Sequence, residues 1–184
     1  MKTIAVIAAP GFEEIELNAP VDILRRLGHR VLVAGLKSLV IQGAHEVSLQ
    51  TDTTMNQIDP EQIDALVLPG GQGSWVLRDT PEVIDLIQKT YAKGKLVAAI
   101  CAAPIALAKA GIIAGKNVTA YPAGPVYEDL KDSIIHKDKM VVQDGTIITG
   151  MAPAAALEFG FAIAANLSAP EAVADERKAM CMPD

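Results

Sequence analysis

The chain has 184 residues, of which 51% are hydrophobic, 21% charged and 4% aromatic, and its formal net charge is −6. This length and composition predict one globular domain over residues 1–184, and the acidic balance argues against binding to nucleic acid. No apolar stretch reaches the roughly 18 residues that a membrane span requires.

The first residues, MKTIAVIAAPGFEE, hold a short apolar run that two glutamates follow at once. This pattern is typical of an opening buried strand rather than of a signal peptide. The two cysteines, Cys101 and Cys181, are too few and too far apart for a disulfide framework. We therefore expect a reducing, cytoplasmic setting.

Strand and helix patterns alternate along the chain. Apolar or β-rich runs predict strands at 3–9, 30–36, 64–71, 96–100 and 117–122. Helical spacing of apolar residues predicts helices within 11–29, 80–95, 103–111, 152–167 and 169–184. The segments 39–54 and 139–150 are typical of hairpins, and the second carries an Asp-Gly turn.

Three local features refine this pattern. Pro20 lies inside the first predicted helix, where we expect a kink or a broken first turn. Thr80 is the expected N-cap of the helix that begins at Pro81. The helix within 152–167 is apolar almost all round, which favours a buried position.

The alternation predicts a mostly parallel sheet with helices on both faces. In such folds ligands bind beyond the carboxyl ends of the strands. This rule selects three segments: residues 13–16, the Gly70-Gly71 turn, and Cys101.

Cys101 stands where a buried strand meets a helix, with small residues after it. A nucleophile elbow has this form, and the start of a helix favours a thiolate. A buried core cysteine fits the same pattern equally well. The spacing alone leaves both interpretations open.

Glu16, near the start of the first helix, could face Cys101 in its protonated form and donate a hydrogen bond to the sulfur. Spacing alone favours the alternative that all three glutamates of residues 13–16 are solvated. Gly70, Gly71 and the N–H of Ala102 could form an oxyanion hole, although a plain turn explains the glycines as well. None of the histidines is placed beside Cys101 by the sequence, and no metal-ligand spacing is present.

The chain resembles the ThiJ/PfpI superfamily, in the branch of the parkinsonism-associated protein deglycase (DJ-one). The resemblance is carried by APGFEEIELNAPVDILRRLG, DALVLPGG, VAAICAAP and APAAALEFGFAIAANL, which occur in the family's order. It implies a flavodoxin-like α/β/α sandwich, similar to the class I glutamine amidotransferases, and a homodimer. It also implies a reactive Cys101, its partner Glu16, and an oxyanion site at Gly70, Gly71 and Ala102, with no cofactor or metal.

Two positions depart from the family pattern. Tyr121 stands where many members carry a histidine near the cysteine, and a tyrosine of ordinary pKa near 10 is a poor base at neutral pH. His45 matches a position where an arginine often reaches the partner subunit near the cysteine, which would make the local field depend on pH. Both residues are expected to line the pocket, and a Cys-His peptidase becomes the least favoured function.

The resemblance implies a stress-response protein in which Cys101 acts on a small aldehyde or a glycated substrate, as in glyoxalases and protein deglycases. One alternative is an oxidative-stress sensor or chaperone-like protein whose cysteine oxidises to sulfinate without turnover. Another is an unreactive domain that binds a partner through its dimer face. The first two depend on the same cysteine.

Overall fold

The computed structural model describes residues 1–183 and contains one seven-stranded sheet. In spatial order its strands are β10 (Val141–Asp144), β11 (Ile147–Gly150), β7 (Leu96–Ile100), β6 (Ala65–Leu68), β1 (Thr3–Ala8), β2 (Arg30–Gly35) and β5 (Thr53–Thr54). All neighbours are parallel except β10 and β11, which form the hairpin predicted at the Asp-Gly turn. The central strands are buried on both faces, as their continuous apolar sequence predicts.

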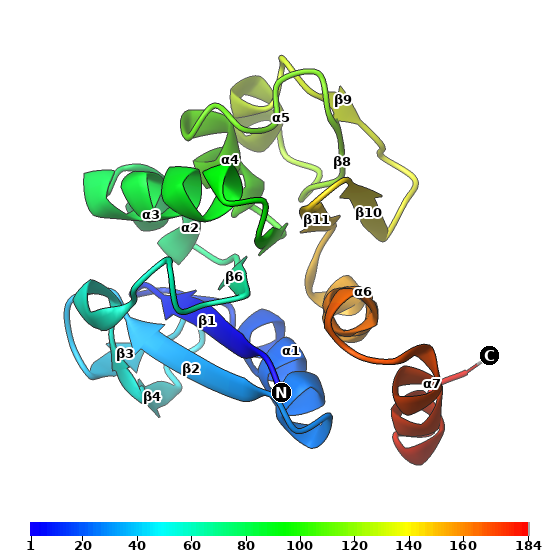
Figure 1. The fold of residues 1–184 in the computed structure, drawn as a ribbon. Helices are drawn as coiled ribbons and strands as arrows, with labels where there is room; N and C mark the ends of the chain where they lie inside the picture. Colours follow the sequence, from blue (N-terminus) through cyan, green and yellow to red (C-terminus); the bar gives the residue numbers. More distant parts are fainter. Residues whose placement is uncertain (184) are drawn as a thin grey trace.

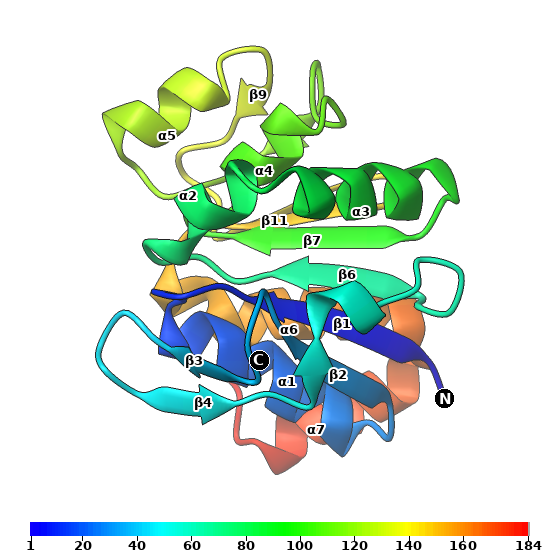
Figure 2. The same ribbon diagram turned by 90° about the vertical axis from the view of Figure 1, so that its left-hand side faces the viewer.

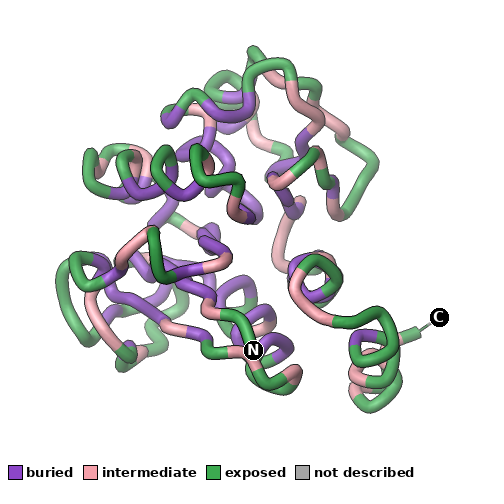
Figure 3. The backbone as a smooth tube through the Cα atoms, viewed as in Figure 1, coloured by how far each residue is buried: buried purple, intermediate pink, exposed green. Residues whose placement is uncertain are grey.

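Helices cover both faces of this sheet (Figure 1). One face packs against α1 (Glu14–Arg26), α6 (Ala156–Leu167) and α7 (Pro170–Ala179). The other packs against α2 (Gly73–Arg78), α3 (Pro81–Ala92), α4 (Pro104–Lys109) and α5 (Gly124–Asp129). Buried residues concentrate in the strands and on the sheet-facing sides of the helices (Figure 3). The predicted α/β/α sandwich is confirmed.

Short elements complete the fold outside the main sheet. The 39–54 excursion forms the hairpin of β3 (Val40–Gln42) and β4 (Ser48–Gln50), as predicted. A second small sheet pairs β8 (Asn117–Val118) with β9 (Ile134–Ile135). Two 3₁₀ turns, η1 (Met55–Gln57) and η2 (Pro153–Ala155), precede β6 and α6.

Of the two expectations at Pro20, a broken first turn is wrong, and a kink stays a prediction. Helix α1 runs without interruption through Pro20, which is buried against α6. The proline removes one backbone hydrogen bond inside the helix, and the packing of α1 against α6 offsets this loss. Thr80 is the N-cap of α3 as predicted, but its hydroxyl donates to the Val76 carbonyl and accepts no hydrogen bond from the start of the helix.

The central parallel strands deliver their carboxyl ends to one edge of the sheet, and the arrows of β6 and β7 point the same way in Figure 2. The start of α1, the Gly70-Gly71 turn and Cys101 follow β1, β6 and β7 at this edge. None of the helices in residues 1–183 has the length and hydropathy needed to cross a membrane.

Candidate active site

Cys101 occupies a strained turn directly after β7. Its φ of 65° lies in the left-handed region, which non-glycine residues adopt rarely and at a cost of about 1–3 kcal/mol. The turn is held on both sides: the Cys101 N–H donates to the Gly150 carbonyl at 2.9 Å, and its carbonyl accepts the Tyr121 N–H at 2.8 Å. The chain therefore turns sharply at Cys101, as a nucleophile elbow requires.

The Cys101 side chain is buried, and its sulfur faces two backbone N–H donors. One belongs to Gly71, in the turn after β6, and the other to Ala102. Gly71 has a φ of 81°, which glycine adopts without strain. Two converging N–H groups can stabilise negative charge on the sulfur or on an oxygen bound next to it.

Gly70 lies between Cys101 and Glu16 and leaves no room for a side chain. A Cβ atom at this position would stand 2.6 Å from the Cys101 Cβ and 2.9 Å from the Ile100 carbonyl oxygen, and would collide with the Glu16 carboxyl. Carbon atoms in favourable contact lie about 3.5–4.0 Å apart. Glycine therefore allows the carboxyl and thiol groups to approach each other.

Glu16 is fully buried, and its Oε2 accepts the Gly70 N–H at 2.9 Å. Its Oε1 makes no hydrogen bond of standard geometry to the described residues. The carboxyl nevertheless lies close enough to Cys101 for each group to shift the pKa of the other. Catalytic hydrogen bonds are often long in the absence of substrate, so this arrangement is suited to proton transfer.

Glu13 is the N-cap of α1 and is also buried. Its Oε2 accepts the Glu16 N–H at 2.8 Å, and its own N–H donates to the Gly70 carbonyl at 3.0 Å. The expectation that all three glutamates are solvated is therefore wrong for Glu13 and Glu16. Sequence reasoning assigned Glu13 no role, because glutamate is not among the preferred N-cap residues that mark a helix start.

The pKa values of Glu16 and Cys101 are both raised. Burial raises the pKa of Glu16 from 4.5 to about 7, with a further contribution from the charge of Glu13. Burial, followed by the charge of Glu16, raises the pKa of Cys101 from 9.0 to about 12. The N–H groups of Gly71 and Ala102 lower the pKa of this thiol, but burial and the charge of Glu16 have the larger effect, so the thiolate that the helix start was predicted to favour is not favoured overall.

The carboxyl and thiol groups therefore titrate as a pair. The first proton leaves near pH 7, and repulsion between two buried anions opposes loss of the second. A Cys101 thiolate at neutral pH requires the remaining proton to reside on Glu16. The site thus joins a nucleophile to a carboxyl group that can hold and transfer a proton.

No histidine hydrogen-bonds to Cys101 within the part of the chain that the structure describes. The side-chain partners are Ser168 for His29, Glu14 for His45 and Asn117 for His136. A cysteine peptidase of the Cys-His type needs a histidine base beside the thiol. The geometry does not provide one.

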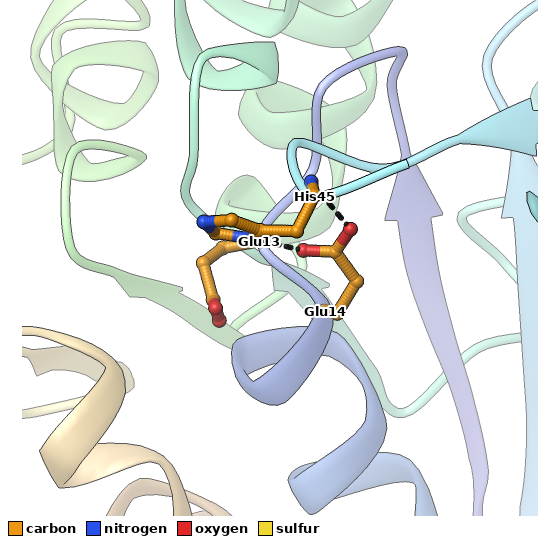
Figure 4. Close-up of side chains that lie close together, drawn as sticks. All are labelled: Glu13, Glu14 and His45. Carbon is orange, nitrogen blue, oxygen red and sulfur yellow. Dashed lines mark hydrogen bonds and ion pairs between the residues drawn. The ribbon is translucent and has the colours of Figure 1, made fainter. Parts of the chain in front are cut away.

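His45 and Tyr121 make different contacts near the site. The His45 N–H donates to Glu14 Oε1 at 2.7 Å, and its ring Nδ1 lies 2.8 Å from Glu14 Oε2 (Figure 4). The hydrogen bond with Glu14 raises the pKa of the exposed His45 imidazole. Tyr121 contacts Cys101 through its backbone, and its side chain is 45% exposed. The pocket-lining roles of both residues stay predictions.

Glu13, Glu14 and His45 offer oxygen and nitrogen atoms within 4.8 Å of one another. These atom types suit a divalent cation. However, the hydrogen bonds described above already use one oxygen of Glu13 and both oxygens of Glu14. We therefore assign no metal to this group.

The raised pKa of Glu16 predicts a pH-dependent loss of stability. A carboxyl whose pKa rises on folding stabilises the protein fully below its ordinary pKa of 4.5, and this contribution is lost as the pH rises through about 7. The full shift corresponds to about 3 kcal/mol. Urea unfolding at pH 4.5 and pH 7.5 should show a smaller decrease in the free energy of unfolding for Glu16→Gln than for the wild type. Equal decreases would contradict the burial of an ionisable Glu16.

Known proteins are similar to this chain in sequence and in fold. Residues 2–166 match the model of the DJ-1/PfpI family. Protein dj-1beta of Drosophila melanogaster is 38% identical over 186 residues, covering 97% of this chain and 96% of that protein. A protein named as a deglycase in Pyrococcus abyssi is 34% identical, covering 82% of this chain and 90% of its own length.

The fold comparison agrees with the sequence comparison. The crystal structure of Drosophila melanogaster DJ-1beta superposes with a TM-score of 0.94, covering 100% of this chain and 99% of that one. The family match therefore extends over the sheet, both helical layers and the Cys101 edge. This chain belongs to the DJ-1/PfpI family.

Proposed function

We propose that this protein acts on reactive aldehydes or their protein adducts through Cys101, as a glyoxalase or deglycase. The observation that carries the proposal is the buried Glu16 carboxyl beside Cys101, with the N–H groups of Gly71 and Ala102 directed at the sulfur. The name of the Pyrococcus relative supports the same class of substrate.

In the first step, the Cys101 thiolate attacks the aldehyde carbon of an α-oxoaldehyde such as methylglyoxal. A C–S bond forms, and the electron pair of the carbonyl moves to its oxygen. The N–H groups of Gly71 and Ala102 stabilise this developing oxyanion. Glu16 then gives its proton to the oxygen, which leaves a neutral hemithioacetal and a Glu16 carboxylate.

In the second step, the Glu16 carboxylate removes the hydrogen from the former aldehyde carbon. The resulting enediolate takes the proton back at the adjacent carbon, while the hydroxyl proton of the former aldehyde carbon passes to the adjacent oxygen, which converts the hemithioacetal to a thioester. Water hydrolyses the thioester, releasing lactate and restoring the Cys101 thiol. The net reaction adds one water to methylglyoxal, and the oxidation of one carbon balances the reduction of its neighbour.

The histidine partners described above disfavour the peptidase alternative. Without an imidazole beside Cys101, neither activation of the thiol nor protonation of a leaving amine has the usual group. An aldehyde has no leaving group in the first step, so a single carboxyl can serve as the proton donor and acceptor. The Glu16–Cys101 pair therefore suits aldehydes better than peptides.

The test is the conversion of methylglyoxal to lactate, followed by proton NMR in buffer without glutathione. We expect lactate to accumulate catalytically, beyond one equivalent per protein molecule. Consumption of one equivalent with no lactate would indicate that Cys101 only traps the aldehyde. That outcome would contradict the proposed turnover.

A further inference from the structure

Three backbone N–H groups close a ring of hydrogen bonds at the start of α1. The Glu13 N–H donates to the Gly70 carbonyl at 3.0 Å, and the Gly70 N–H donates to the Glu16 carboxyl at 2.9 Å. The Glu16 N–H completes the ring by donating to the Glu13 carboxyl at 2.8 Å. The ring joins the end of β6 to α1 and fixes both the backbone and the side chain of Glu16.

Capping the start of α1 does not by itself require a glutamate at position 13. Asparagine, aspartate, serine and threonine are the preferred N-caps. Glu13 is only 7% exposed, so its carboxylate is a second buried acidic group beside Glu16. A buried charge is costly unless it is well hydrogen-bonded, and a neutral cap would avoid that cost. The position of Glu13 therefore points to a use for its charge.

We propose that Glu13 is a positioning residue that keeps the proton on Glu16 and thereby sets the reactivity of Cys101. This inference rests on the proposed function only in that it concerns the same cysteine. The ring of hydrogen bonds keeps the two carboxyl groups near each other, because the backbone N–H of Glu16 donates to the Glu13 carboxyl while the Glu16 carboxyl accepts the Gly70 N–H. The charge of Glu13 raises the pKa of Glu16, because two neighbouring buried carboxylates repel each other.

The sign of the effect follows from this repulsion. Burial is the largest cause of the raised pKa of Glu16, and the charge of Glu13 raises this pKa further. Without it, Glu16 ionises at lower pH, and its own charge then holds Cys101 as a thiol. Loss of the Glu13 charge should therefore reduce the thiolate population at neutral pH.

Other charged groups face this pair. Cys101 faces Glu16 from the end of β7. His45, on the loop between β3 and β4, has a ring nitrogen within 4.8 Å of a Glu13 oxygen and pairs with Glu14 (Figure 4). Because the hydrogen bond with Glu14 raises the pKa of His45 and so favours its charged form, the measurements below are repeated in a His45→Gln background.

The experiment is the pH dependence of Cys101 alkylation by iodoacetamide, measured by peptide mass spectrometry. In Glu13→Gln the amide oxygen can still cap α1, but the charge is gone. We expect the alkylation rate at pH 7 to fall roughly three- to tenfold, with the midpoint of the neutral step moved to lower pH. Glu13→Asp retains the charge and should recover most of the rate. In the His45→Gln background, Glu14→Gln, which removes the partly buried charge of the neighbouring residue, should leave the profile unchanged.

A double-mutant cycle separates the charge effect from a structural one. In the Glu16→Gln background there is no Glu16 carboxyl whose proton the charge of Glu13 could retain. Glu13→Gln should therefore cause no further change in the alkylation rate. A full effect of Glu13→Gln in that background, or a wild-type profile for Glu13→Gln alone, would overturn the proposal. Alkylation needs no aldehyde, so a failure of turnover leaves this test intact.

A second neutral cap guards against misfolding. Glu13→Asn carries one of the preferred N-cap side chains, and thermal unfolding shows whether each variant is folded. A folded Glu13→Asn with a reduced alkylation rate supports the charge effect. A folded Glu13→Asn with the wild-type profile contradicts it, even if Glu13→Gln fails to fold.

Discussion

Replacing Cys101 with serine should lower the rate of lactate formation from methylglyoxal by on the order of 10³-fold or more. A serine hydroxyl ionises far less readily than a thiol, and burial makes the anion still less favourable in this site. Glu16 cannot compensate, because its carboxyl is a weak base for an alcohol. Proton NMR of lactate measures the effect directly.

Cys181 provides the matched control for this substitution. It is the other cysteine of the chain, and it is exposed near the end of α7. Cys181→Ser should retain the wild-type rate within a factor of about two, because it lies outside the site and surface substitutions have small effects. Equal rates for Cys101→Ser and the wild type would exclude Cys101 as the nucleophile.

Replacing Gly70 with alanine should have the second-largest effect. The new methyl group would stand 2.6 Å from the Cys101 Cβ and collide with the Glu16 carboxyl, so one of these groups must move. Overpacking of this kind costs about 1–3 kcal/mol in the free energy of unfolding. A displacement of about 1 Å can reduce turnover roughly 100-fold. Urea unfolding and the lactate assay measure the two effects.

Gly124 gives a control with the same change in sequence. A Cβ atom there would have nothing within 4 Å, so Gly124→Ala should change neither the free energy of unfolding by more than about 0.5 kcal/mol nor the rate. If Gly70→Ala behaved like Gly124→Ala, the close approach of Glu16 and Cys101 would not be needed for activity.

Most of the fold could be predicted from local patterns in the sequence. The alternation of buried runs and helical spacing predicts a parallel sheet, and the Asp-Gly turn before Ile147 predicts the β10–β11 hairpin. Position at the carboxyl ends of β1, β6 and β7 predicts which segments meet. These features depend on local sequence pattern and on general rules of topology, so a single sequence is sufficient to predict them.

The side-chain arrangement at the site depends on contacts that local pattern does not encode. Spacing could not choose among the three glutamates, because the choice depends on which of them meets Gly70 across 54 residues. The resemblance selected Glu16, and the structure buries it beside Cys101. The uninterrupted helix at Pro20 also depends on distant packing, against α6.

Local structure predicted only one of the influences on the pKa of Cys101. The start of a helix favours a thiolate, but burial and a neighbouring carboxylate have the larger effect on the pKa. Both depend on tertiary structure. The sequence showed that a carboxyl and a thiol could meet, and only the three-dimensional arrangement places them close enough for each to shift the pKa of the other.

We expect the ionisation of Glu16 to control the reactivity of Cys101, and the pH dependence of Cys101 alkylation in Glu16→Gln tests this most directly. Both proteins are compared in the Cys181→Ser background, in which Cys101 is the remaining cysteine. The wild type should react in two steps, near pH 7 and at strongly alkaline pH, as the pair loses its two protons. Glu16→Gln should react in one step centred below that of the wild type's alkaline step, because the charge that opposes the thiolate is absent while the burial remains. Superimposable profiles would contradict the coupling of Glu16 to Cys101.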